Sequence, residues 1–164
     1  MKGKISPRNK LRAVRPAPRK EIIWKMKVKD IMNPKPRTIT PDTSIEDSID
    51  RLRSQIGDCF PVIDKERKLV GVVTESDLLH VLHAPVREAV VGGVLTKNVM
   101  KSMARNVGEI MTKNPITATP EMTIQETLNI MAGIKFRHLP VVQGGKLVGL
   151  ISLRDILNLY QLIP

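Results

Sequence analysis

Aromatic residues are scarce in this chain of 164 residues, which contains one Trp, one Tyr and two Phe. Its hydrophobic core must therefore consist of aliphatic side chains and some of the eight methionines. The scarcity also argues against a surface on which nucleic-acid bases stack, because such surfaces need aromatic rings. Hydrophobic residues still make up 41% of the chain, too many for a disordered protein. We expect a folded domain with an aliphatic core.

Cysteine and long apolar runs are also nearly missing. Cys59 is the only cysteine, which excludes an intrachain disulfide and favours a reducing compartment. No run approaches the roughly 18 apolar residues of a membrane span. Ile22-Ile23-Trp24 is too short for the apolar part of a signal peptide. We therefore expect a cytoplasmic protein without a membrane contact.

Acidic residues are almost absent from the start of the chain. Residues 1–27 carry ten Lys or Arg and a single acid, Glu21, so they hold +9 of the net charge of +11. Residues 1–20 include three prolines and show little periodicity, which predicts a basic, flexible tail over 1–23. Such a tail either aids solubility or contacts nucleic acid or an acidic surface, and a charge run alone favours the first function.

One segment of the sequence occurs twice. VKDIMNPKPRTITP at 28–41 corresponds to VGEIMTKNPITATP at 107–120, an offset of 79 residues. FPVI at 60–63 corresponds to LPVV at 139–142 with the same offset, and KLVG at 68–71 corresponds to KLVG at 146–149, where the offset becomes 78. Matches in the same order across more than fifty residues indicate an internal duplication, which must be recognised before a fold is assigned.

Each copy predicts the order strand, helix, strand, strand, helix. In the first copy a strand near 37–40 is followed by a helix that Ser44 caps, a hairpin of 60–63 and 68–74, and a helix from Glu75. The first helix has one apolar face, and the second carries three leucines: Ile45, Ile49, Leu52 and Ile56, then Leu78, Leu79 and Leu82.

The second copy repeats this pattern. Thr123 caps its first helix, whose apolar face consists of Ile124, Leu128 and Met131. One such unit buries too little apolar surface to be stable alone. We therefore expect an α+β (α/β) fold in which two βαββα repeats pack as a pseudo-twofold pair.

The repeats define three further boundaries. We place the first repeat at 24–84, a linker at 85–105 and the second repeat at 106–164. Within the linker, Gly92-Gly93 indicates a break and Thr96 is expected to cap a short helix. That helix presents Val99, Met100 and Met103 either to the core or to a dimer partner, and core packing is the simpler interpretation.

The repeated turn from a strand into a helix is the most informative feature. It spans 71–77 in the first copy and 149–155 in the second. The start of a helix attracts phosphate, to which Thr74 and Ser152 add hydroxyl donors. The carboxylates of Asp77 and Asp155 accept hydrogen bonds and suit a ribose diol. The alternative is that each pair only caps its helix, and two copies favour binding modestly.

Taken together, these motifs make the sequence similar to tandem cystathionine-β-synthase domains, the CBS pair or Bateman module. The similarity covers about residues 24–161 and rests on D/E-I-M, Thr-x-Thr-Pro, Phe/Leu-Pro-Val, Leu-Val-Gly and Gly-x-x-Thr/Ser-x-x-Asp, each present twice. The resemblance implies a disc-like pair with two clefts, each formed by both copies, and adenosine ligands. AMP, ADP or ATP are expected first, with S-adenosylmethionine or a dinucleotide as the alternative.

The resemblance also implies which residues line the clefts. The turn Asp holds the ribose, the turn Thr or Ser lies near phosphate, and residues of Thr-x-Thr-Pro and those before Pro-Val line the adenine end. The implied residues are Thr38, Thr40, Cys59, Val72, Thr74 and Asp77, with Thr117, Thr119, Arg137, His138, Leu150, Ser152, Arg154 and Asp155. Asp58-Cys59 stands where the second copy has Arg137-His138, so we expect two unequal clefts. The cleft that contains Arg137 and His138 should favour more negative ligands. The alternative is that Arg137 only forms a surface ion pair.

Three functions compete at this stage. The first is a non-catalytic regulatory module that needs no cofactor, forms a homodimer and signals to an effector protein. The second is a nucleic-acid-associated adaptor that uses residues 1–20 as its anchor. The third is an enzyme in which His80 and His83 hold a metal with Asp77, but spacing alone is weak evidence and no Gly-rich Walker loop is present.

Overall fold

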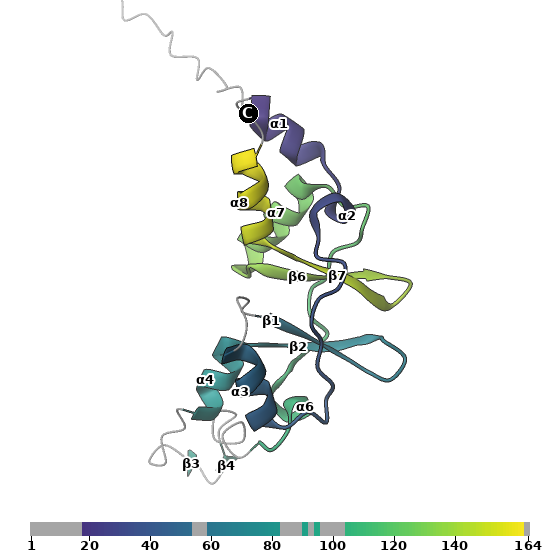
Figure 1. The fold of residues 1–164 in the computed structure, drawn as a ribbon. Helices are drawn as coiled ribbons and strands as arrows, with labels where there is room; N and C mark the ends of the chain where they lie inside the picture. Colours follow the sequence, from purple (N-terminus) through teal and green to yellow (C-terminus); the bar gives the residue numbers. More distant parts are fainter. Residues whose placement is uncertain (1–17, 54–58, 83–89, 92–93, 96–103, 163–164) are drawn as a thin grey trace, which may run out of the picture.

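The computed structural model describes residues 18–53, 59–82, 90–91, 94–95 and 104–162. Two antiparallel hairpins lie in the middle, and helices cover their outer sides (Figure 1). The helices are α1 (Pro18–Lys25), α2 (Val28–Ile31), α3 (Ile45–Arg53), α4 (Glu75–Leu82), α6 (Val107–Ile110), α7 (Ile124–Ile134) and α8 (Leu153–Leu162). The strands are β1 (Cys59–Ile63), β2 (Leu69–Thr74), β3 (Val90–Val91), β4 (Val94–Leu95), β5 (Thr112–Lys113), β6 (His138–Gln143) and β7 (Lys146–Ser152).

The two hairpins are the shared frame of the repeats. β1 pairs with β2 and β6 pairs with β7, and each ladder shifts register directly after the valine that follows its proline, Val62 and Val141. The expected first strand of each repeat is reduced to one parallel bridge, Ile39 with Val62 and Ala118 with Val141. The mixed α+β class and the pseudo-twofold pair are confirmed, with the first strand of each repeat shorter than the sequence predicted.

Both predicted helix caps are present. The amide of Asp47 donates to Ser44 Oγ at 3.1 Å, and the amide of Glu126 donates to Thr123 Oγ1 at 3.2 Å. The faces behind these caps are buried as the periodicity predicted, with Ile45 at 7% and Ile124 at 0% exposure. Ile56 lies outside the described residues. α4 differs, because only Leu78 of its three leucines is buried.

Each repeat completes the core of the other. Val28 of α2 belongs to the cluster that contains Ile124, Leu139 and Ile151, all from the second repeat. Val107 and Ile110 of α6 belong to the cluster of the first repeat. The chain therefore exchanges its two similar segments, the VKDIM and VGEIM motifs, between the halves. The packing units are consequently not the same as the sequence units.

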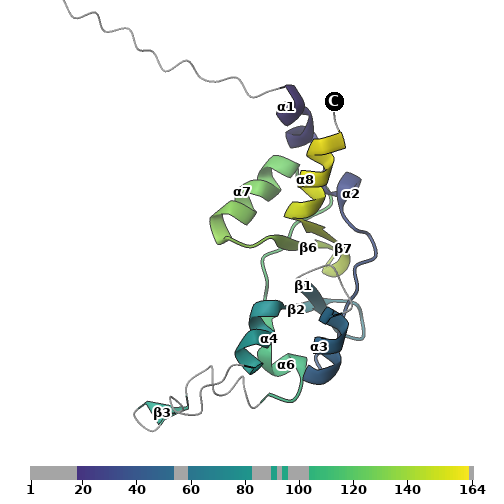
Figure 2. The ribbon, with the colours of Figure 1, turned by 60° about the vertical axis from the view of Figure 1, so that its left-hand side comes forward.

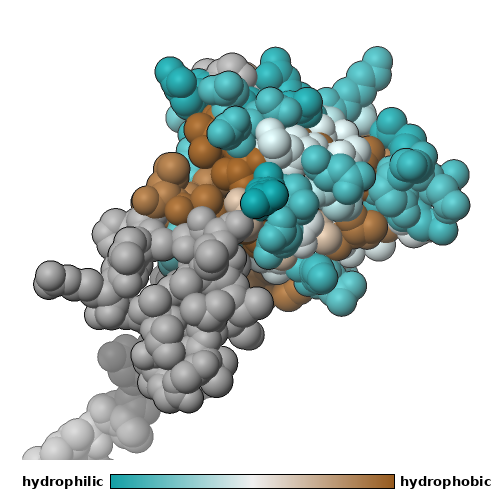
Figure 3. Space-filling view, turned by 90° about the horizontal axis from the view of Figure 1, so that it is seen from below, coloured by the Kyte–Doolittle hydropathy of each residue, from teal (hydrophilic) through white to brown (hydrophobic). Residues whose placement is uncertain are grey.

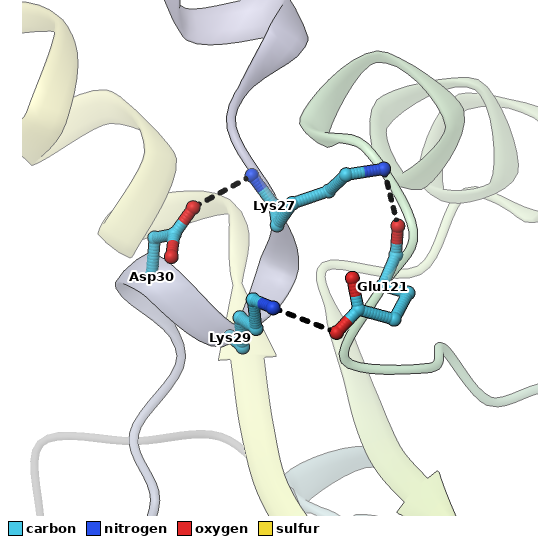
Figure 4. A network of polar contacts seen from close by, with 4 residues as sticks. All are labelled: Lys27, Lys29, Asp30 and Glu121. Atoms are coloured by element: carbon cyan, nitrogen blue, oxygen red, sulfur yellow. Dashed lines mark hydrogen bonds and ion pairs between the residues drawn. The ribbon is translucent and has the colours of Figure 1, made fainter.

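Polar contacts hold α2 against the loop before α7 (Figure 4). Lys27 Nζ donates to the carbonyl oxygen of Glu121 at 2.7 Å, and Lys29 Nζ pairs with Glu121 Oε1 at 2.8 Å. The hydrogen bond with the Glu121 side chain raises the pKa of Lys29. Because both side chains are exposed, this ion pair adds little stability. Backbone hydrogen bonds hold α2 in place, since the amides of Val28 and Lys29 donate to the carbonyl oxygens of Met122 and Pro120.

The predicted boundary of the basic tail needs a correction at its C-terminal end. Residues 18–25 form α1, which packs against α7 and α8 (Figure 2). Ile23 is 2% exposed and belongs to the core of the second repeat. The apolar Ile22-Ile23-Trp24 group, too short for a signal peptide, is long enough to anchor one helix. Residues 1–17, on which the extended-tail prediction also falls, lie outside the described part.

The linker contains a small hairpin that the sequence did not predict. Val90 pairs with Leu95 and Val91 with Val94, so β3 and β4 enclose the expected break at Gly92-Gly93. The helix expected from Thr96, with Val99, Met100 and Met103, falls outside the described residues. None of the helices in the described ranges is long and apolar enough to cross a membrane.

An apolar surface lies at the α3–α4 end of the molecule. Leu79 is 60% and Leu82 is 70% exposed, and brown side chains gather there beside the grey atoms (Figure 3). A cavity of about 450 Å³ separates the two helices and is lined by Ile49, Leu52, Arg53, Glu75, Ser76, Leu78, Leu79 and Leu82. In the second repeat α1 packs over the corresponding groove, where Ile23 and Trp24 line a smaller cavity of about 230 Å³ together with side chains of α7 and α8.

The cap of α7 makes a prediction about pH. Hydrogen bonds from the Thr123 amide and hydroxyl lower the pKa of Glu126 below its usual 4.5. The cap therefore stabilises the fold above the usual pKa, and this contribution disappears as pH falls through the lowered folded-state value. We expect the Tm advantage of the wild type over Glu126→Gln to shrink between about pH 5 and pH 3. A constant difference across that range would contradict the assignment.

Candidate functional site

The first repeated turn joins β2 to α4 and is closed by Asp77. The amide of Thr74 donates to Asp77 Oδ2 at 3.0 Å, and the Thr74 hydroxyl donates to the same oxygen at 2.9 Å. Asp77 is 8% exposed, whereas the Thr74 side chain is half-buried. The carboxylate is therefore held in one orientation before any ligand arrives.

The second turn joins β7 to α8 and repeats this geometry. The amide and hydroxyl of Ser152 donate to Asp155 Oδ2 at 2.8 and 2.6 Å. The Asp155 amide returns a hydrogen bond to Ser152 Oγ at 3.2 Å, which completes a reciprocal cap. The turn residues therefore do cap their helix, which was the alternative to ligand binding. Within the described residues, however, every hydrogen bond to this carboxylate uses Oδ2, which leaves Oδ1 as an acceptor.

The hairpin registers bring further implied residues to each turn. Cys59 faces Thr74 across the first ladder, and His138 faces Ser152 across the second. Val72 and Leu150 lie two residues before Thr74 and Ser152 and face the prolines Pro61 and Pro140. The structure therefore groups the residues before Pro-Val with the Thr/Ser-x-x-Asp turns in both halves.

The two copies differ beside these turns. Cys59 is 7% exposed, whereas Arg137 is exposed and His138 is half-buried. The His138 ring meets Phe136 edge to face at 6.4 Å, and the carbonyl oxygen of Arg137 accepts a hydrogen bond from the first amide of α8. Arg137 precedes β6, and Arg154 is exposed on α8.

The Thr-x-Thr segments are divided between two environments. Thr38 and Thr117 are half-buried, next to the bridges that join their segments to β1 and β6. Thr40 and Thr119 are exposed and start turns: Thr43 donates its amide to the Thr40 carbonyl oxygen, and Met122 does the same at Thr119. Of the four threonines, Thr38 and Thr117 are therefore the more buried pair.

Sequence reasoning missed the segments that border the turns. Asn33 exchanges two backbone hydrogen bonds with Leu150, at 2.9 and 3.0 Å, so the chain after α2 lies along β7. Thr112 and Lys113 of β5 lie along β2 in the same way. Gly71 and Gly149 permit these close approaches, and their equivalent positions in the two copies were the available signal.

The metal alternative concerns Asp77, His80 and His83, of which the first two lie in the described part of the chain. Among the described residues, no group of three or more His, Cys, Asp or Glu side chains is arranged to hold a metal ion. His80 is exposed on α4, and His83 lies outside the described part.

Comparison with known proteins identifies both halves. The family model of the CBS domain matches residues 28–84 and 107–161. Inosine-5'-monophosphate dehydrogenase of Korarchaeum cryptofilum is 38% identical over 120 residues, which are 73% of this chain and 21% of that protein. CBSX1, a chloroplastic CBS domain-containing protein of Arabidopsis thaliana, is 29% identical over 134 residues, covering 70% of this chain and 54% of that protein. The chain thus spans about a fifth of the dehydrogenase it matches.

Solved structures agree with these matches. CBSX2 in complex with AMP superposes with a TM-score of 0.74 at 28% identity, covering 84% of this chain and 97% of that one. The CBS domain pair of MJ0100, in complex with 5'-methylthioadenosine and S-adenosyl-L-methionine, gives a TM-score of 0.67 at 26% identity, with 83% and 96% covered.

Proposed function

Since this chain belongs to the CBS domain family, we propose that it is a regulatory module without catalysis of its own. It binds AMP, ADP or ATP in clefts between its repeats and signals the occupancy to a partner protein. Two related structures carry AMP in one case and S-adenosylmethionine with methylthioadenosine in the other, which supports an adenosine ligand.

The orientation of Asp155 is the observation that carries this proposal. The cap uses Oδ2 of the carboxylate, and the remaining Oδ1 can accept hydrogen bonds from the ribose diol. A carboxylate that is already oriented loses little conformational entropy when the ligand binds. Asp77 has the same place in the first copy. Capping and binding are thus compatible roles of one side chain.

The hydroxyls of Thr74 and Ser152 are proposed to have a role other than the phosphate contact that the sequence suggested. Thr74 and Ser152 already donate to their aspartates, so they support the ribose acceptor. The exposed Arg137 and the half-buried His138 are better placed to meet phosphate beside the second turn. Thr117, in its half-buried position, is proposed to line the adenine end together with Leu150.

Isothermal titration with AMP, ADP, ATP and S-adenosylmethionine tests this function. We expect at least one ligand to bind and to raise Tm, because a ligand at a hundred times its Kd adds about 2.7 kcal/mol to the free energy of unfolding. Mass spectrometry of material retained through purification provides an independent readout. If no adenosine ligand binds, the proposal fails.

S-adenosylmethionine remains the second candidate for a specific reason. The related MJ0100 pair carries it, and the second repeat of the present chain has Ile116 next to Thr117, an apolar neighbour that tolerates a methylthio group. A preference for S-adenosylmethionine over AMP in the titration would select this alternative. The homodimer, the effector protein, the cytoplasmic location and any nucleic-acid contact through residues 1–20 remain predictions.

A further inference from the structure

A second cavity lies in the first repeat, apart from the turns. It has a volume of about 420 Å³ and is lined by Pro36, Arg37, Thr38, Arg51 and Phe60. The first three residues precede the bridge at Ile39, Arg51 belongs to the last turn of α3, and Phe60 lies on β1. Three segments that are distant in sequence thus bring two guanidinium groups and one hydroxyl to one cavity.

The charge of this cavity is one-sided. Among the described lining residues, two carry a permanent positive charge and none carries a negative one. Guanidinium groups present several N–H donors and no acceptor, which suits a phosphate oxygen. Thr38 can add a hydroxyl donor. Both arginines have another interaction in the structure, so an anion would exchange with or add to an existing contact.

The second repeat provides an internal comparison. At the offset of 79 residues, Ile116 stands for Arg37, Ile130 for Arg51 and Leu139 for Phe60, while Thr117 repeats Thr38. Ile116 is half exposed and Ile130 packs against the core of the second repeat. The threonine is therefore common to both copies, whereas the pair of arginines is particular to the first.

The helix dipole alone does not account for Arg51. A cation in the last turn of a helix is favourable wherever the helix lies, but α7, the counterpart of α3, has no basic residue in its last turn. Moreover, Arg53 already occupies the last turn of α3, where it pairs with Asp50 at 3.7 Å. Arg51 is an exposed residue of α3 whose side chain lines this cavity.

We propose that this cavity is an anion subsite for phosphate groups, formed by Arg37, Arg51 and Thr38. The phosphate belongs either to a bound nucleotide or to a free phosphate ion. The inference rests on the proposed function only in the first case. It assigns Thr38 to an anionic group, whereas the family resemblance assigned it to the adenine end. This cavity is additional to the phosphate contacts proposed for Arg137 and His138 beside the second turn, and the second repeat has isoleucines at the positions of Arg37 and Arg51.

The test replaces both arginines with the side chains of the second copy. Arg37→Ile with Arg51→Ile is compared with Lys35→Ile with Arg53→Ile, which removes the same charge from neighbouring positions outside the cavity. Adenosine, AMP, ATP and pyrophosphate are titrated into each full-length protein. We expect the first variant to bind ATP or pyrophosphate about tenfold more weakly or worse, as loss of charge-assisted hydrogen bonds implies. The control variant should match the wild type, and adenosine affinity should stay unchanged in both.

The outcomes separate the two proposals. Pyrophosphate binding that depends on Arg37 and Arg51, without nucleoside binding, supports the subsite and contradicts the nucleotide function. Nucleotide binding that is equal in the two double variants overturns the subsite and leaves the nucleotide function intact. Equal weakening in both variants shows general charge attraction only, and this also overturns the subsite. Circular dichroism of both variants confirms that each is folded before titration.

Discussion

Gly149→Val is expected to destabilise the protein by about 1–3 kcal/mol, the usual cost of overpacking a filled site. A Cβ atom at Gly149 would lie 2.5 Å from Met32 Sδ and 3.0 Å from the carbonyl oxygen of Asn33. The sulfur can move, but Asn33 is fixed by two backbone hydrogen bonds to Leu150. The substitution therefore separates the exchanged segment after α2 from β7. Chemical denaturation measures the change.

Two further variants serve as controls for Gly149→Val, one at Gly133 and one at Met32. Gly133 in α7 has no atom within 4 Å of an added Cβ, so Gly133→Ala should stabilise the helix by about 0.5–1 kcal/mol. Met32→Ala combined with Gly149→Ala should cost less than the sum of the two single changes, because the truncated side chain removes the sulfur contact. Full additivity would show that the close approach does not limit the site.

Asp155→Ala is expected to weaken binding of an adenosine ligand to its own cleft by about 10- to 100-fold. The reason is the loss of the acceptor for the ribose hydroxyls, which the cap holds in place in the free protein. Asp155→Asn keeps a neutral acceptor and should give an intermediate loss. Asp77→Ala should affect the other cleft in the same way. Two-site titration calorimetry separates the clefts.

Loss of the cap must be distinguished from loss of the ribose contact. Asp155→Ala also removes the cap of α8, which costs about 1 kcal/mol of stability. Glu126→Ala removes a comparable capping carboxylate from α7, where Glu126 accepts from the Thr123 amide at 2.7 Å. This control should lose stability and keep its ligand affinity. Unchanged affinity in both aspartate variants would refute the ribose role.

The sequence pattern predicted the features that depend on residues close together in the chain. The caps at Ser44 and Thr123 and the two hairpins follow from side-chain hydrogen bonding and alternation within a few residues. The repeat itself predicted the pseudo-twofold pair. Strand length near Ile39 was overestimated, because prolines at 36 and 41 bracket the segment and limit it to one bridge.

Non-local features were not available from the pattern. The exchange of α2 and α6 depends on which hydrophobic surface each segment meets. The sequence of each motif does not reveal whether it packs on its own repeat or on the other. α1 was missed because its apolar group is short and follows a run of basic residues. Arg37 and Arg51 were missed because they lie fourteen positions apart and meet only through the fold.

The exchange of α2 and α6 has a consequence for how the chain folds and for how it arose. Lys27 and Lys29 meet Glu121 across 94 and 92 positions. The core of the first repeat also needs Val107 and Ile110, so it cannot be completed during synthesis until α6 has emerged. Such long-range closure slows folding. An ancestral single copy would have had no partner segment within its own chain. It would have reached the same packing by swapping that segment between two molecules, and the gene duplication then made this dimer permanent.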